Sequence, residues 1–145
     1  MSQSVFFLKR TYIMMRKQLD VRLSEYNLTT SQLEVLGYLY KIPHGLEQVQ
    51  LQQYSGITSA TLTGILDKME KRQYISREIS HSDGRIKVVV LTEHGFQIFA
   101  RLIDLMEQFE NDMLNGFSKA ERALLADWLQ RIAKNMGDDW IYGSE

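Results

Sequence analysis

Small hydroxyl-bearing residues and cations are concentrated between residues 58 and 72, where they offer hydrogen bonds and positive charge rather than covalent chemistry. If this segment is a helix, the residues on or near its outward face are Ser59, Ala60, Thr61, Thr63, Gly64, Asp67, Lys68 and Lys71. Short hydroxyls suit hydrogen bonds to base edges in a DNA groove, and lysines suit contacts with phosphates. The plainer interpretation is that the hydroxyls cap the helix and the lysines form an ordinary solvated surface.

A second candidate group lies at Asp83-Gly84-Arg85. Asp-Gly is a strong signal for a tight hairpin turn, so the Arg85 side chain is expected to extend beyond the hairpin tip. An arginine in this position could enter a narrow minor groove, where negative potential is concentrated. The alternative is an exposed Asp–Arg pair that contributes little.

Residues for catalysis or metal binding are sparse. The chain has no cysteine, no Gly-x-Ser-x-Gly and no phosphate-cradling glycine loop, so we expect no enzyme and no cofactor. The histidines, His44, His81 and His94, lie far apart in sequence, and none has a second histidine four residues away. We expect no metal site, although His44 and Glu47 are the pair to examine.

Apolar spacing of three and four residues predicts helices for most of the chain. The first spans residues 5–26, and the second follows the capping box Thr29 to Gln32 and stops at Pro43. A short polar helix over 47–54 is expected to turn Val49 and Leu51 inward. Thr58 is expected to cap a further helix, whose buried stripe is Leu62, Ile65, Leu66 and Met69.

Beyond Arg72 the hydrophobic period changes to two, which predicts a β-hairpin with strands at 74–80 and 86–91. Thr92 then precedes a long helix that is apolar on more than one face. A second capping box, Ser118 to Glu121, opens the last helix. A helix, a turn with Gly56, a second helix and a hairpin make a winged helix-turn-helix, so the fold class is mainly α with a small β-hairpin wing.

Composition is compatible with a globular domain of 145 residues, 44% of them apolar. The net charge of −1 divides unevenly: residues 58–91 carry six basic and four acidic side chains, whereas residues 92–145 carry five and ten. No apolar run suits a membrane span and no secretory signal is evident, so we expect a cytoplasmic protein. Because the basic excess is small, a winged helix that binds a protein partner instead of DNA stays open as the alternative.

Several motifs together resemble the multiple antibiotic resistance regulator (MarR) family of bacterial transcription factors. They are Leu28-Thr29-x-x-Gln32-x-x-x-Leu36, Gly56-Ile57-Thr58, Leu66-Asp67-Lys68-Met69-Glu70-Lys71-Arg72, Ile75-x-Arg77, Ser82-Asp83-Gly84-Arg85 and Val90-Leu91-Thr92-x-x-Gly95. The pattern departs from the family at Gln73, where a glycine is common, at Gly64, where a longer polar residue is common, and at Gln52, where a small residue is usual.

The resemblance implies a transcriptional regulator, expected to be a repressor, that binds a pseudo-palindromic double-stranded DNA operator as a homodimer. It divides the chain into a DNA-binding lobe at 29–91, helical dimerisation segments at 1–28 and 92–138, and a tail at 139–145. It gives Arg85 a minor-groove role with Asp83 orienting it, and it gives Arg77 a phosphate contact or a bracing role in the wing. It also implies a pocket for a small aromatic anionic effector, for which the sequence offers Met14, Met15, Arg16, Tyr38 and Tyr40.

Overall fold

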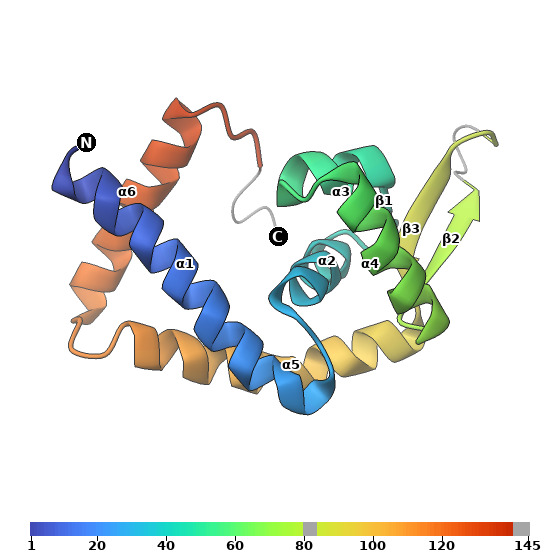
Figure 1. The fold of residues 1–145 in the computed structure, drawn as a ribbon, viewed down its shortest axis with the longest axis horizontal. Coiled ribbons are helices and arrows are strands. Elements are labelled where there is room, and N and C mark those ends of the chain that lie inside the picture. Colours follow the sequence, from blue (N-terminus) through green and yellow to red (C-terminus); the bar gives the residue numbers. More distant parts are fainter. Residues whose placement is uncertain (80–83, 141–145) are drawn as a thin grey trace. The chain divides into compact units, whose positions relative to one another are not determined.

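Six α-helices and a three-stranded antiparallel sheet make up the computed structural model, which describes residues 1–79 and 84–140 (Figure 1). The helices are α1 (Gln3–Leu23), α2 (Thr30–Lys41), α3 (Gln48–Ser55), α4 (Ser59–Lys71), α5 (Glu93–Met113) and α6 (Lys119–Asn135). A 3-10 helix, η1 (Ser24–Tyr26), follows α1, and the strands are β1 (Leu46–Glu47), β2 (Ile75–Ile79) and β3 (Lys87–Leu91).

The chain divides into two compact units, Met1–Leu105 and Met106–Glu145. The first contains α1 to α4, the sheet and the N-terminal part of α5, and the second contains the end of α5 and α6. The predicted fold class, mainly α with a small hairpin wing, is confirmed.

Local hydrogen bonds explain most helix boundaries. Thr29 and Gln32 form the predicted capping box at the start of α2, and Ser118 and Glu121 form the one at the start of α6. Thr92 accepts a hydrogen bond from the backbone N–H of Gly95 at the start of α5. These short-range bonds satisfy N–H groups that have no partner within the helix.

The core of the first unit is built from leucines on α2, α3 and α4 and from one face of the sheet. Its fully buried side chains include Leu36, Leu39, Leu51, Leu62, Leu66, Met69 and Ile75. In the register of the sheet, Ile75 pairs with Leu91 and Leu46 pairs with Val89, so these four side chains share the face that packs on the helices.

Two expectations about the core were wrong. Val49 is 60% exposed, because on the short α3 only Leu51 lies on the core side, and Ile65 on α4 is only partly buried. Strand β1, which has two residues, was not predicted, since such a segment is too short to show a period of two.

Candidate nucleic-acid interface

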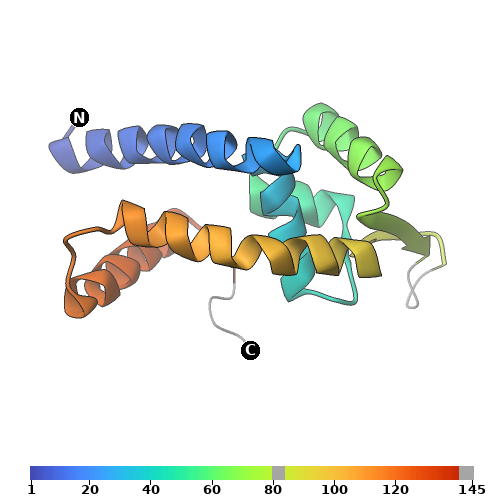
Figure 2. The same cartoon turned by 90° about the horizontal axis from the view of Figure 1, so that it is seen from below.

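Helix α4 is held by α3 on one side and by the wing on the other (Figure 1). Between α3 and α4, Gly56 takes the left-handed conformation with φ 70°, which glycine adopts without a steric cost, and the chain reverses within three residues. Figure 2 shows β2 following directly from the C-terminal end of α4. The helix, turn, helix and hairpin therefore have the order of a winged helix-turn-helix.

The predicted outward face of α4 is exposed. Every one of its candidate DNA-binding residues is open to solvent, namely Ser59, Ala60, Thr61, Thr63, Gly64 and Lys68. Opposite them, Leu62, Leu66 and Met69 are fully buried. The helix thus presents its small and hydroxyl-bearing residues outward while its apolar stripe fixes it to the lobe.

The hydroxyls of α4 make more local contacts than the sequence suggested. Thr58 is the N-cap residue by position, but its hydroxyl donates to the Thr61 hydroxyl at 3.0 Å and makes no cap bond to the backbone, so the expected side-chain cap is wrong. The Thr63 hydroxyl donates to the carbonyl of Ser59 at 3.0 Å and accepts from Gln48 of α3 at 2.9 Å. The contact with Gln48 couples the N-terminal ends of the two helices.

Arg77 on β2 connects the wing to α4. Its guanidinium lies 3.1 Å from the Asp67 carboxylate and 3.2 Å from that of Glu70. The two acidic residues are three positions apart on α4, so one planar guanidinium can reach both. Sequence reasoning named Arg77 but not its partners, because a contact between a strand and a preceding helix leaves no local pattern.

Arg85 is exposed at the end of the hairpin next to β3. Asp83, its expected orienting partner, lies outside the described residues.

At the base of the wing, Gln73 has φ 61°. A residue with a Cβ is strained there, as expected from the departure at this position.

The five candidate effector residues differ in their surroundings. Met14 is exposed, and Arg16 donates to Glu34 and to Ser31 of α2 at 2.5 and 2.8 Å. Tyr38 stacks on Tyr54 and donates to its carbonyl, whereas Tyr40 packs against Phe96 and Phe99. Met15, one residue before Arg16 on α1, is partly buried.

The ion pair between Arg16 and Glu34 is partly buried. Burial raises the pKa of the Glu34 carboxyl above its ordinary value of 4.5, and attraction to Arg16 opposes this without cancelling it. For Arg16, burial alone would lower the pKa, but the attractions and hydrogen bonds of Glu34 and Tyr12 together outweigh burial, and the pKa is raised. Arg16 therefore stays charged, and an anionic ligand at this site would compete with Glu34 for it.

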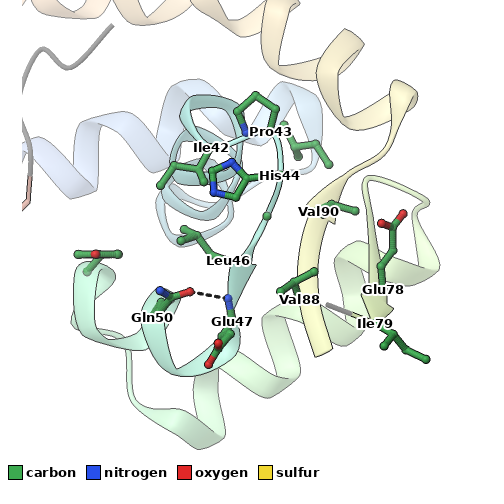
Figure 3. Close-up of a pocket in the computed structure, with 13 residues that line it drawn as sticks. Ile42, Pro43, His44, Leu46, Glu47, Gln50, Glu78, Ile79, Val88 and Val90 are labelled. Carbon is green, nitrogen blue, oxygen red and sulfur yellow. Dashed lines mark hydrogen bonds between the residues drawn. The ribbon is translucent and has the colours of Figure 1, made fainter. Parts of the chain in front are cut away.

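A cavity of about 790 Å³ lies beside the wing sheet (Figure 3). None of the five candidate effector residues lines it. It is bordered by the segment between α2 and β1, by α3 and by the two longer strands, with Pro43, His44, Glu47, Glu78, Val88 and Val90 among its lining residues. His44 and Glu47 both line this cavity, but no group of three or more metal-ligating side chains occurs among the described residues.

The order of elements and the exposed face of α4 define a winged helix-turn-helix protein of the kind that places its second helix in the major groove. The MarR family model matches residues 28–87. The HTH-type transcriptional regulator PecS of Dickeya dadantii (strain 3937) is 28% identical over 131 residues, which cover 89% of this chain and 79% of PecS. The chain belongs to the MarR family.

Several solved structures have the same fold. Transcriptional regulator PA3341 is 30% identical with a TM-score of 0.80, covering 90% of this chain and 96% of its own. The complex of S. aureus MepR with DNA has 23% identity and a TM-score of 0.76, covering 93% and 98%. Bordetella bronchiseptica BpsR, whose DNA binding is regulated by 6-hydroxynicotinic acid, has 22% identity and a TM-score of 0.80, covering 91% and 99%.

Members of this family are transcriptional regulators and not enzymes, as the sequence predicted. Among the residues that the structure describes, none of the helices combines the length and apolar character needed to cross a membrane.

Proposed function

We propose that this regulator represses transcription by binding a pseudo-palindromic operator as a homodimer, with α4 in the major groove and Arg85 in the adjacent minor groove. The observation that carries the proposal is the exposed N-terminal face of α4, which follows α3 and the Gly56 turn. Lys68 supplies charge for the phosphate backbone further along the same helix. The solved complex of MepR with DNA, which has the same fold, supports DNA as the partner.

DNA binding is tested by titrating the duplex upstream of the protein's own gene at two salt concentrations. Phosphate contacts release counterions, so affinity is expected to fall steeply as salt rises. Ser59→Glu places a negative charge on the exposed start of α4, and Gln97→Glu places the same charge on the exposed surface of α5. Ser59→Glu should abolish DNA binding, and Gln97→Glu should leave DNA binding nearly unchanged. A wild type that ignores duplex DNA would favour the alternative, a winged helix that binds protein.

The homodimer rests on apolar surface that each unit leaves open. On α1, Val5, Phe6, Phe7, Leu8 and Tyr12 are each at least 43% exposed, and on α6 the same holds for Leu124, Trp128 and Ile132. Such continuous apolar surface is unusual on a monomer. Val5→Lys should lower the fraction of dimer in sedimentation experiments, whereas Val49→Lys, on an α3 side chain that is 60% exposed, should not. A wild type that is a folded monomer at micromolar concentration would contradict the dimer.

A small aromatic anion is the effector class we propose. The regulation of BpsR by 6-hydroxynicotinic acid supports it. Within this chain Arg16, with Met14, Met15, Tyr38 and Tyr40 as candidate lining, offers the cation for a carboxylate. A ligand that binds the non-DNA conformation more tightly would release DNA. If saturating phenolic acids change neither the melting temperature nor the operator affinity, this effector class is excluded.

A further inference from the structure

Arg72, the C-cap residue that follows α4, joins two segments that are far apart in sequence. Its Nη1 donates to the carbonyl of Asn27 at 2.5 Å, and its Nη2 donates to the carbonyl of Tyr26 at 3.0 Å. Both carbonyls lie in the connection between α1 and α2. The side chain therefore ties the C-terminal end of α4 directly to the segment by which α1 enters the lobe.

The two carbonyls are well suited to a cation. Tyr26 ends η1, and Asn27 follows in the left-handed conformation with φ 54°, so the last carbonyls of the helical turn point away from it without helical partners. The end of a helix also carries partial negative charge. A planar guanidinium can donate to two such oxygens at once in a fixed geometry. A lysine ammonium sits on a flexible stem, so its hydrogen bonds fix the geometry less well.

Tyr74 also holds this guanidinium. Nη2 of Arg72 donates to the Tyr74 hydroxyl at 2.9 Å, and the central carbon of the guanidinium lies 4.7 Å from the centre of the Tyr74 ring. Tyr74 is buried, its carbonyl accepts from the backbone N–H of Thr92, and its ring meets His94 edge to face. Through Tyr74, Arg72 is thus connected to the start of α5 as well as to the end of α1.

We propose that Arg72 is a positioning residue that fixes the orientation of α4 relative to α1 and α5, and thereby the separation of the two α4 helices in the dimer. The inference rests on the proposed function. Apolar contacts such as those of Leu62 and Leu66 attach α4 to the lobe but are non-directional, so they tolerate small rotations. The hydrogen bonds of Arg72 are directional, and they act where the lobe joins both segments that we assign to dimerisation.

The first test varies the distance between operator half-sites, because two α4 helices at a fixed separation bind best to half-sites about one helical turn apart. Operators shortened or lengthened by one base pair should bind wild type at least tenfold more weakly than the best operator. Arg72→Met should reduce this preference to about threefold or less. Lys71→Met removes the same charge from the neighbouring exposed residue and should keep the preference. An Arg72→Met protein that keeps the wild-type preference would overturn the inference.

A second measurement separates positioning from a simple loss of stability. Because the chain has no cysteine, Ala60→Cys gives a single attachment site for a spin label on α4. In the DNA-free dimer, the distance between the two labels should be narrowly distributed in the otherwise wild-type background and broad with Arg72→Met. Arg72→Lys, which keeps the charge but lacks the planar guanidinium, should also broaden the distribution of distances. If Arg72→Met does not fold, Arg72→Lys replaces it in this measurement. Unchanged distributions in both variants would show that Arg72 acts on stability alone.

The results that would overturn the proposed function differ from those that would overturn only the role of Arg72. A wild type that binds no duplex or forms no dimer overturns the proposed function, and this inference with it. A wild type that binds one spacing best, together with Arg72 variants that do the same, overturns only the role of Arg72.

Discussion

Arg77 on β2 lies 3.1 Å from the carboxylate of Asp67 on α4. The wing is thereby attached to the helix that carries the candidate base contacts, one turn before that helix ends. The Arg77 side chain is only 23% exposed, whereas that of Asp67 is 56% exposed, so the pair is partly screened by solvent.

Replacing Arg77 tests this attachment. Arg77→Met should lower the free energy of unfolding by at most about 1 kcal/mol, since partly exposed ion pairs contribute about 0.2–1 kcal/mol. Asp67→Asn should cost less, because Glu70 still pairs with the guanidinium. Urea unfolding of both variants and of the double variant measures the coupling. Additive effects would show that the contact contributes nothing to stability.

Arg85→Ala should weaken operator binding far more than folding. Arg85 is exposed, so truncation creates no cavity, and the free energy of unfolding should change by no more than about 0.5 kcal/mol. Loss of a groove contact should cost about 1–3 kcal/mol of binding free energy. Thermal melting and operator titration of the same variant check both numbers. Near-equal operator affinity would remove the wing from the recognition scheme.

Gly95 and Gly64 should respond to alanine in opposite directions. A Cβ at Gly95 would lie 2.1 Å from the carbonyl oxygen of Tyr74, a backbone atom that cannot move aside easily. Gly95→Ala should therefore destabilise by at least about 2 kcal/mol, toward the upper part of the usual range of about 1–3 kcal/mol for overpacking. At Gly64 nothing lies within 4 Å, so Gly64→Ala should stabilise α4 by about 0.5–1 kcal/mol. Melting curves of the two variants make the comparison.

Gln73→Gly should stabilise the protein. A residue with a Cβ loses about 1–2 kcal/mol in the left-handed region, and the greater freedom of glycine in the unfolded chain returns part of it, which leaves a gain of about 0.5–1 kcal/mol. Asn27, with φ 54°, is the control, because asparagine tolerates this conformation and Asn27→Gly should gain less. Equal gains at the two positions would show that Gln73 is not strained. Chemical denaturation measures both.

Glu34 and Glu121 should change the pH dependence of stability with opposite signs. Burial raises the folded-state pKa of Glu34, so its contribution is present below the ordinary pKa of 4.5 and is lost as pH rises through the raised value. Hydrogen bonds from Ser118 lower the pKa of Glu121, whose contribution is present above 4.5 and is lost as pH falls through the lowered value.

Unfolding titrations of wild type, Glu34→Gln and Glu121→Gln between acid and neutral pH separate the two effects. The stability of wild type relative to Glu34→Gln should decline as pH rises. Relative to Glu121→Gln it should increase. If the stability of wild type relative to both variants changed with pH in the same direction, the opposite pKa shifts of Glu34 and Glu121 would be contradicted.

The sequence by itself determined the features whose causes lie within a few residues. The two capping boxes, at Thr29 and Ser118, were predicted because donor and acceptor are three residues apart. The exposed face of α4 was predicted because a helix repeats every 3.6 residues. Gln73, whose φ is 61°, was singled out only through the family resemblance, because a glycine is common at that position.

Only the tertiary structure decided which side chains serve as partners across the fold. Arg72 meets carbonyls 45 and 46 residues away, Arg77 finds its carboxylates on a preceding helix, and the Thr58 hydroxyl turns to Thr61 instead of the backbone. Strand β1 exists because β3 lies beside it. Periodicity records which face of an element is buried, but it carries no information about what that face meets, because the choice of partner depends on how the elements pack together.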